Sequence, residues 1–416
     1  MKIKINFYLI LLFFISLNIF AQEFEADLQI RPRYEYRNGY KQPIAYGVKA
    51  GQFISQRSRV ALRYGQEKLT TKFTFQNIRV WGDVKSTATS DVNGIEIFEA
   101  WANYNFTEKW SAKLGRQVLS YDNQRILGEI DWLQQGQSHD AILLAYDNKK
   151  SKINLGFAYN ANMESLVEEP YLVASYKSFQ YAWYHTSFDK LNMSLLFLNT
   201  GYENKPVLPI TELTVDYIQT FGTYLNSKGK NWDSNLSFYG QTGKSKGKTV
   251  SAFDAAINFN YALTEKFKIG IGYEFLSGKS QLDTSTDVKS FYPLFGTNHA
   301  FNGYMDYFYV GNYQNSVGLQ DIFIKLLYNF QKWQFAVMPH LFNAGNVVVN
   351  PEKMEMNSYL GTEIDFTMLY TVNKYIKTSG GYSQMFGTET LQQLKGGNTN
   401  HTNNWAWIMV NVDPKL

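Results

Sequence analysis

The chain has 416 residues, a formal net charge of +4 and no cysteine, and 17% of its residues are aromatic. This aromatic content excludes a disordered chain, and the missing cysteines exclude a disulfide scaffold and a thiolate metal site. The one apolar stretch of useful length, Phe7–Phe20, is too short for a transmembrane helix, so a helical membrane protein is excluded as well. A large β-rich protein remains.

Residues 1–21 are typical of a secretory signal peptide. Lys2 and Lys4 form a basic start, Phe7–Leu17 is the apolar region, and Ala21 suits the position before the cleaved bond. No cysteine follows this segment, which excludes a lipoprotein anchor. We therefore expect an exported chain whose folded part is residues 22–416.

The rest of the chain alternates apolar and polar residues in segments of strand length. In Phe253–Leu263, for example, Phe253, Ile257 and Phe259 share one face, whereas Asp254 and Asn258 share the other. Such a period of two predicts a strand between two different environments. The same pattern recurs in Lys266–Phe275, Trp232–Gln241, Glu212–Phe221 and Leu191–Phe197.

The connections favour a membrane barrel over a soluble β-sandwich, which would also alternate. Short turns with a lysine between mostly aromatic residues recur at Phe106–Trp110, Phe188–Leu191, Leu263–Phe267, Phe330–Trp333 and Val372–Tyr375. Between them lie long loops near residues 38–53, 82–94, 120–138, 161–173, 278–316 and 387–403. Short periplasmic turns, long extracellular loops and aromatic girdles are typical of outer-membrane barrels. We count 18 strands from Ala26 to Asp413, with no composition break between them, and predict an all-β, single 18-stranded antiparallel transmembrane β-barrel.

The small net charge hides an uneven distribution. Residues 22–125 carry 16 Lys and Arg against 11 Asp and Glu, whereas residues 126–416 carry 22 against 25. All nine arginines lie in the first of these two parts, and they are the candidate substrate-binding residues: Arg31, Arg33, Arg37, Arg57, Arg59, Arg63, Arg79, Arg116 and Arg125.

Strand alternation predicts that the first arginines line the lumen. Arg31, Arg33 and Arg37 share a face on the first strand, and Arg57, Arg59 and Arg63 share one on the second. An arginine facing lipid near the midplane would cost roughly 2–4 kcal/mol, so this face must point inward. Arg79 is out of phase with Lys72, Thr74 and Gln76, which predicts a bulge or register change near Gln76–Asn77.

A contiguous arc of guanidinium groups favours an anion-conducting pore. Guanidinium groups bind carboxylates through two donors and stay charged, so a ladder of weak sites could pass a polyanion along. In the alternative interpretation, the arginines only pair with lumenal acids and fill the interior: Glu35, Glu99, Asp254, Glu274, Glu363 and Asp365.

Several motifs of the chain resemble the alginate export family. They are Gln76–Gly82, Gly115–Arg125, Leu127-Gly128, Asp131-Trp132, Ser138–Asp140 and Phe291–Phe308. The resemblance implies an 18-stranded outer-membrane barrel with an arginine-rich lumen that conducts an anionic, uronate-type polysaccharide. It also implies lumenal contacts for Arg57, Arg59, Arg79, Arg116 and Arg125.

Besides the anionic polysaccharide, the expected partners are outer-membrane lipid, the barrel-assembly machinery and periplasmic export proteins. The chain departs from the family pattern in two respects. It continues past the last predicted strand, Trp405–Val412, and does not end on an aromatic residue, and it has no arginine beyond Arg125. Any later lumenal cation must be a lysine such as Lys266, Lys268 or Lys325.

A general or small-anion porin, transporting in either direction, remains an alternative.

Two long loops carry a second ambiguity. Loop 278–316 contains the aromatic residues Phe291, Tyr292, Phe295, Phe301, Tyr304, Tyr307, Phe308 and Tyr309. Their rings could stack on sugars and gate the mouth, or they could form a hydrophobic cluster of the loop itself. Loop 120–138 has the same two interpretations.

Enzymatic signals are weak. The five histidines lack metal-ligand spacing, Gly243–Gly247 matches a nucleophile elbow only by chance, and Gly270–Gly272 lacks the third glycine of a dinucleotide site. We expect no enzyme activity, no cofactor, no bound metal and no nucleic-acid partner. An outer-membrane hydrolase that uses His139 and Asp140 is the alternative from a different functional class.

Overall fold

The computed structural model describes residues 22–88, 90–171, 173, 175–204, 213–308 and 316–414. The expected signal peptide, residues 1–21, lies outside the described residues, as does Tyr309. The strands are β1 Gln22–Asn38, β2 Gly51–Gln66, β3 Leu69–Val80, β4 Glu96–Asn105, β5 Trp110–Gln117, β6 His139–Asp147, β7 Ser151–Tyr159, β8 Ser178–Phe188, β9 Leu191–Asn204, β10 Thr214–Lys228, β11 Trp232–Ser245, β12 Lys248–Ala262, β13 Phe267–Leu276, β14 Leu319–Phe330, β15 Trp333–Ala344, β16 Tyr359–Thr371, β17 Ile376–Gly387 and β18 Asn403–Val412.

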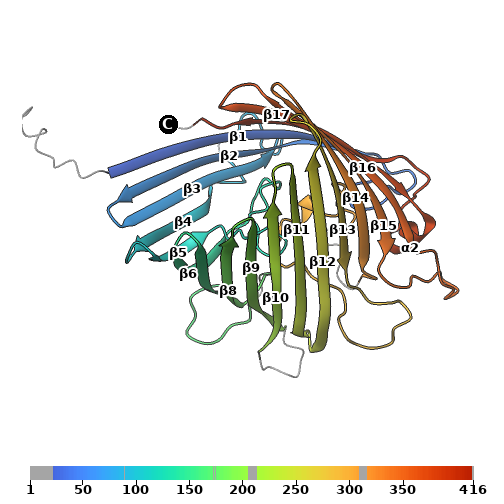
Figure 1. Cartoon of the computed structure of the whole chain (residues 1–416), viewed down its shortest axis with the longest axis horizontal. Coiled ribbons are helices and arrows are strands. Elements are labelled where there is room, and N and C mark those ends of the chain that lie inside the picture. Colours follow the sequence, from blue (N-terminus) through green and yellow to red (C-terminus); the bar gives the residue numbers. More distant parts are fainter. Residues whose placement is uncertain are drawn as a thin grey trace, which may run out of the picture.

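These strands close into an antiparallel barrel. Each strand pairs with its neighbours in the sequence, and β1 also pairs with β18, for example through Glu35 and Trp407. Figure 1 shows the strands side by side along a curved wall. Closure leaves no unpaired strand edge, which a lipid environment requires because it offers no hydrogen-bond partner. The predicted fold class, an 18-stranded antiparallel barrel, is confirmed.

The five predicted short turns all lie between strands at one rim. In two of them a threonine supports the turn: Thr107 Oγ1 accepts from the backbone N–H of Trp110 at 3.1 Å, and Thr264 Oγ1 accepts from that of Phe267 at 3.0 Å. Side-chain acceptors of this kind favour compact turns. In these two turns the threonine therefore has a direct structural role.

The opposite rim carries the long loops and one tight turn. Loop 345–358 was not predicted, and β11 joins β12 through the tight turn Lys246-Gly247, where both residues have positive φ. Loop 388–402 contains the helix α2 Glu389–Lys395, which begins with Thr388 as its N-cap and lies against the start of β16 (Figure 1). A single turn of 3-10 helix, η1 Asn298–Ala300, lies in loop 277–318.

The two faces of the wall differ in chemistry. Large apolar side chains stay exposed on the outer face, among them Phe197, Ile257 and Ile271 at 48%, 51% and 57% exposure. The lumenal face carries charged and polar groups, which include Arg57, Asp254 and Glu274, all buried. Among the described residues, no helix combines the length and the apolar character needed to cross a membrane.

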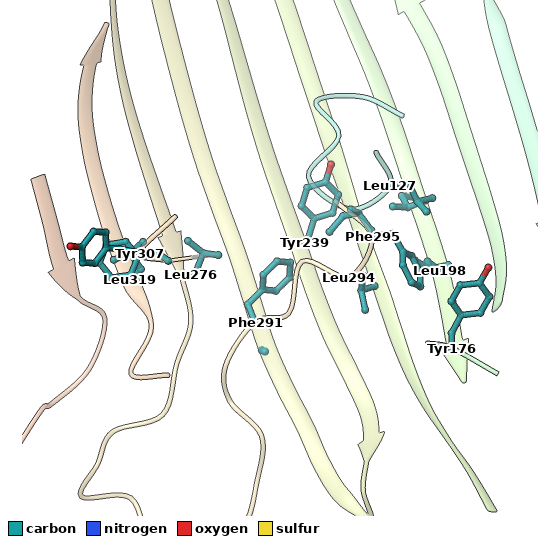
Figure 2. Close-up of a cluster of buried hydrophobic side chains, with 14 of the residues drawn as sticks. Leu127, Tyr176, Leu198, Tyr239, Leu276, Phe291, Leu294, Phe295, Tyr307 and Leu319 are labelled. Atoms are coloured by element: carbon teal, nitrogen blue, oxygen red, sulfur yellow. The ribbon is translucent and has the colours of Figure 1, made fainter. Parts of the chain in front are cut away.

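Described residues of the loop between β13 and β14 pack inside the barrel. Figure 2 shows residues of this loop among wall residues such as Tyr239 and Leu198, with Leu127 of loop 118–138 beside Phe295. The loop residues in the buried hydrophobic cluster are Phe291, Leu294, Phe295, Met305, Tyr307, Phe308 and Val317. Most of the aromatic loop residues therefore pack against the wall, as in the second interpretation of this loop.

The register between strands corrects one prediction. Pairing of β3 with β2 continues without interruption through Gln76 and Asn77 to Arg79, which lies opposite Gln56. The irregularity lies earlier, where β3 pairs with β4: Thr74 faces Glu99 but Phe75 faces Ile97, so Phe98 of β4 is the extra residue. The predicted bulge near Gln76–Asn77 is therefore wrong in position and in strand.

The contrast between the two faces predicts the effect of a new charge. Replacing outer-face Ile257 with Arg should lower the free energy of unfolding in lipid vesicles by roughly 2–4 kcal/mol, because the guanidinium would meet hydrocarbon. The matched variant is Asn258→Arg, one residue along β12 on the lumenal face, which should change it by less than about 1 kcal/mol. Equal losses in urea titrations of the two variants would contradict the assigned faces.

Candidate functional site

The candidate site begins with arginines on the first two strands. In the antiparallel register Arg31 lies opposite Arg57 and Gln29 lies opposite Arg59, so the four side chains share the lumenal face. Arg31 and Arg57 are 3% and 1% exposed. Two guanidinium groups held so close in a buried place need oxygen acceptors to offset their repulsion and desolvation.

Loop 118–138 supplies a carboxylate to these arginines. Asp131 Oδ1 lies 2.7 Å from Arg57 Nη2, and Asp131 Oδ2 lies 3.1 Å from Arg31 Nη1. Arg59 Nη1 lies 3.9 Å from Asp131 Oδ1. Three guanidinium groups therefore converge on one carboxylate, whose side chain is still 51% exposed to solvent.

The neighbouring residues of the loop extend this contact. Arg31 Nη2 donates to the carbonyl oxygens of Asp131 and Leu133 at 2.8 and 3.2 Å, and Arg33 Nη1 donates to that of Trp132 at 2.6 Å. The Arg33 guanidinium also stacks 4.0 Å from the centre of the Trp132 ring. The loop is thus bound to the arginines through backbone oxygens as well as through Asp131.

Charge governs the ionisation of Asp131. Its burial alone would raise the pKa of the carboxyl group, but the nearby Arg57 and Arg31 outweigh this effect and hold that pKa below its ordinary value. Asp131 is therefore ionised at neutral pH and remains a full counter-charge for the arginines.

A cavity of about 550 Å³ lies above this contact, at the mouth of the barrel. Arg33, Arg37 and Arg79 line it together with the acids Glu35, Asp83 and Glu96. Its volume falls within the roughly 300–1,000 Å³ typical of small-molecule sites. Glu35 partly neutralises the cavity, since its carboxylate lies 2.9 Å from Arg33 Nε and 2.9 Å from Arg37 Nη2.

The structure does not bring all nine arginines together. Arg63 has the lumenal phase but lies near the periplasmic end, more than half exposed and 3.5 Å from Glu25. Arg116 pairs in register with Ala100 and Asp140, on the same outer face as Leu114 and Ile142, and its side chain lies 2.9 Å from Asp140. The expected lumenal contact of Arg116 is therefore corrected, because the alternation of β5 points it outward.

Arg79 also has the outer phase, since it lies opposite Gln56 rather than Arg57. It is near the extracellular end of β3, where it lies 3.4 Å from Asp91 and 3.6 Å from Asp83 of the following loop. The expected lumenal contact of Arg79 is therefore corrected as well: its side chain has the outer phase and reaches the mouth cavity only from the rim.

Arg125 lies on the far side of the lumen from the other arginines. From loop 118–138 it reaches the buried acids of β12 and β13, with Arg125 Nη2 2.8 Å from Glu274 and Arg125 Nε 3.5 Å from Asp254. Asn302 of loop 277–318 bridges the same group, accepting from Arg125 at 3.1 Å and donating to Glu274 at 2.7 Å. For Arg125, pairing with lumenal acids is what the structure shows.

Lysines complete the lumenal cations, and one of them was missed. Lys268 and Lys325 face the lumen beside Gly270, as expected, and Lys268 pairs with Asp233. Lys113 of β5 lies 4.2 Å from the centre of the Trp101 ring on the lumenal face. Gln134 was also missed. Its side-chain oxygen accepts from Arg31 Nε at 3.1 Å and its side-chain nitrogen donates to Ser55 Oγ at 3.0 Å, and no local sequence pattern reveals contacts between residues so far apart.

The alternative catalytic pair is not assembled. His139 and Asp140 are successive strand residues, so their side chains point to opposite faces. His139 Nδ1 contacts the Tyr176 hydroxyl at 3.0 Å inside an aromatic cluster, whereas Asp140 binds Arg116. In the part of the chain that the structure describes, no group of His, Asp or Glu is arranged to hold a metal ion.

The ion pair of Arg57 predicts a titration effect. Arg57→Gln removes the shortest ion pair of Asp131, so the pKa of Asp131 should rise towards or above its ordinary value. The anion selectivity of single channels, followed from about pH 3 to 6, should then change at higher pH in the variant than in the parent chain. Arg63→Gln is the control, because Arg63 pairs with Glu25, and it should leave this titration in place. Identical curves for Arg57→Gln and the parent would contradict the ion-pair assignment.

Solved structures of outer-membrane porins share this fold. OpdG of Pseudomonas aeruginosa superimposes with a TM-score of 0.65 at 11% identity, with 95% of this chain and 99% of that chain covered. A BenF-like porin from Pseudomonas fluorescens Pf-5 gives 0.64 at 12% identity with the same coverage. OpdK of Pseudomonas aeruginosa, crystallised with vanillate, gives 0.62 at 11% identity, again with 95% and 99% covered.

At this level of identity the solved structures establish the fold alone. The comparison with curated proteins returned no match. The model of the family described as alginate export matches residues 22–404, which is nearly the whole described chain. The family and the barrel together indicate an outer-membrane channel rather than an enzyme, and the chain belongs to the alginate export family.

Proposed function

We propose that the protein conducts an anionic saccharide of the uronate type across the outer membrane, with the arginines of β1 and β2 as its binding sites. The observation that carries this proposal is the convergence of Arg31, Arg57 and Arg59 on the Asp131 carboxylate. An arrangement that holds one carboxylate in this way has the geometry to hold the carboxylate of a uronate.

The mouth cavity provides the first step of such a path. Arg37 and Arg79 are each about one-third exposed there, at 34% and 30%, whereas the Arg31 and Arg57 side chains are almost fully covered. An acidic sugar would first meet the accessible pair and then the arginines below. Glu35, Asp83 and Asp91 compete for the same guanidinium groups, so each site binds weakly enough to release the sugar.

A channel for small organic anions is the second candidate. Loops 118–138 and 277–318 fold into the lumen, which narrows the path. One neighbour of the same fold was crystallised with vanillate, a small carboxylate. This candidate uses the same arginines and differs in the length of anion that can pass.

The proposal extends to export, membrane insertion and partners. Residues 1–21 act as the cleaved signal peptide, and residues 22–416 are inserted into the outer membrane by the barrel-assembly machinery. The outer apolar face contacts lipid. The family supports an anionic polysaccharide as the transported partner, and periplasmic export proteins are the partners expected for an exporter.

Conductance in planar bilayers tests the function. The parent channel should be anion-selective, and trimannuronate should block its current, whereas uncharged mannotriose should not. The variant Arg33→Ala/Arg37→Ala should weaken the block by at least about tenfold, because the loss of even one charge-assisted hydrogen bond costs about 1.5–3 kcal/mol and a tenfold change corresponds to about 1.4 kcal/mol.

The matched control is Arg116→Ala, which removes the same side chain from the outer face and should leave the block unchanged. Block by benzoate but not by trimannuronate would favour the small-anion candidate. A cation-selective current, or equal block of all three channels, would refute the proposed role of the arginines.

A further inference from the structure

Loop 118–138 spans the lumen between walls of opposite charge. At one end Arg125 lies against Asp254 and Glu274 of β12 and β13, and six residues later Asp131 lies against Arg31 and Arg57 of β1 and β2. The loop therefore brings a cation to the acidic wall and an anion to the basic wall. Each end matches the charge that it meets.

The two ends differ in accessibility. At the Arg125 end the arginine and both acids are at most 6% exposed, whereas the Asp131 side chain is 51% exposed. The Arg125 end is also tied to loop 277–318, since Gly128 N–H donates to Phe295 O at 2.9 Å and Thr297 N–H donates to Gln124 O at 2.8 Å. A competing anion can therefore reach the Asp131 end and not the other.

The accessible end is a small closed segment, residues 130–136, which we call the tip. Its base is fixed, because Gln137 N–H donates to Glu129 O at 2.7 Å and Gln137 Nε2 donates to Phe295 O at 2.7 Å. At the start of the tip, Ile130 has φ +51°, a left-handed conformation that strains a β-branched residue. The contacts of the tip with the wall must offset this strain.

Those contacts form a continuous row of oxygen acceptors. Besides the Asp131 carboxylate, the carbonyl oxygens of five successive residues face arginines of β1 and β2. The carbonyl oxygens of Asp131 and Leu133 accept from Arg31, and that of Trp132 accepts from Arg33. The carbonyl oxygen of Gln134 accepts from Arg57 at 3.4 Å, and that of Gln135 accepts from Arg59 at 3.1 Å. A carboxylate followed by neutral oxygens at short intervals is also what an acidic sugar chain presents.

We propose that the tip is an internal substitute for the substrate: Asp131 and the following carbonyl oxygens occupy the saccharide subsites of Arg31, Arg33, Arg57 and Arg59, and an incoming uronate displaces them. The tip then moves away from the wall about its fixed base while the Arg125 end stays in place. This inference rests on the proposed function and adds to it a gate that opens only for an anion able to replace both the carboxylate and the row of oxygens.

A single thiol placed under the tip can report its movement, because the chain has no cysteine of its own. Ser55 is buried, and its hydroxyl accepts from Gln134 Nε2 at 3.0 Å. We would measure the reaction rate of Ser55→Cys with a charged methanethiosulfonate reagent, in the full-length protein in vesicles. Ser165→Cys, in the exposed segment 161–169, serves as the control for changes in the reagent itself.

Trimannuronate should speed the reaction of Ser55→Cys severalfold, and mannotriose should not. In the double variant with Asp131→Asn the reaction should already be about tenfold faster without sugar, since the charge-assisted hydrogen bonds that hold the tip are lost. Glu129→Gln is the matched control. It removes a carboxylate two residues away whose side chain has no ion pair among the described residues, and it should keep the slow rate.

The outcomes separate the gate from the function. If trimannuronate blocks the current but leaves the Ser55→Cys rate unchanged or slows it, the tip stays in place and the gate is rejected while the function stands. If trimannuronate does not block, the proposed function fails. In that case the Asp131→Asn variant still decides: a fast reaction supports a tip held by Asp131, and a slow one rejects it.

Discussion

Arginine side chains inside a membrane barrel must satisfy two requirements at once. They cannot face hydrocarbon near the bilayer midplane, and once they point inward they need oxygen partners for their donors. Arg31 and Arg57 show both effects, since they lie opposite each other on the lumenal face and each binds several oxygens of loop 118–138. The position of that loop follows from this requirement.

The same requirement explains why the lumen is crowded. The acids of β12, β13 and β16 are buried too, and they take their partners from the loops: Arg125 and Asn302 for Glu274, and the backbone N–H of Met305 for Glu363 at 2.7 Å. Apolar residues of loop 277–308 then pack against the wall. Loop 118–138 thus supplies a counter-charge to each wall, loop 277–318 adds neutral donors and apolar contacts, and the mouth cavity remains beside Arg33 and Arg37.

Local physical chemistry explains how much of the fold could be predicted. Alternating residues and turns such as Phe106–Trp110 depend on near neighbours, so strands, turns and the barrel were predictable from them. Alternation also assigned Arg31, Arg33, Arg57 and Arg59 to the lumen correctly. It did not assign Arg79 and Arg116 correctly, because their faces were inferred from a resemblance and from a bulge that lies elsewhere, in β4 at Phe98.

The sequence by itself determined an all-β chain of 18 strands with an arginine-rich first part, because the periodicity and the turn chemistry that specify these features act between residues close along the chain. Only the tertiary structure decided which groups those arginines bind. Arg31 meets Asp131 a hundred residues later, and Arg125 meets Glu274 across the lumen. Such contacts depend on how the loops fold into the closed barrel, and no local pattern encodes that.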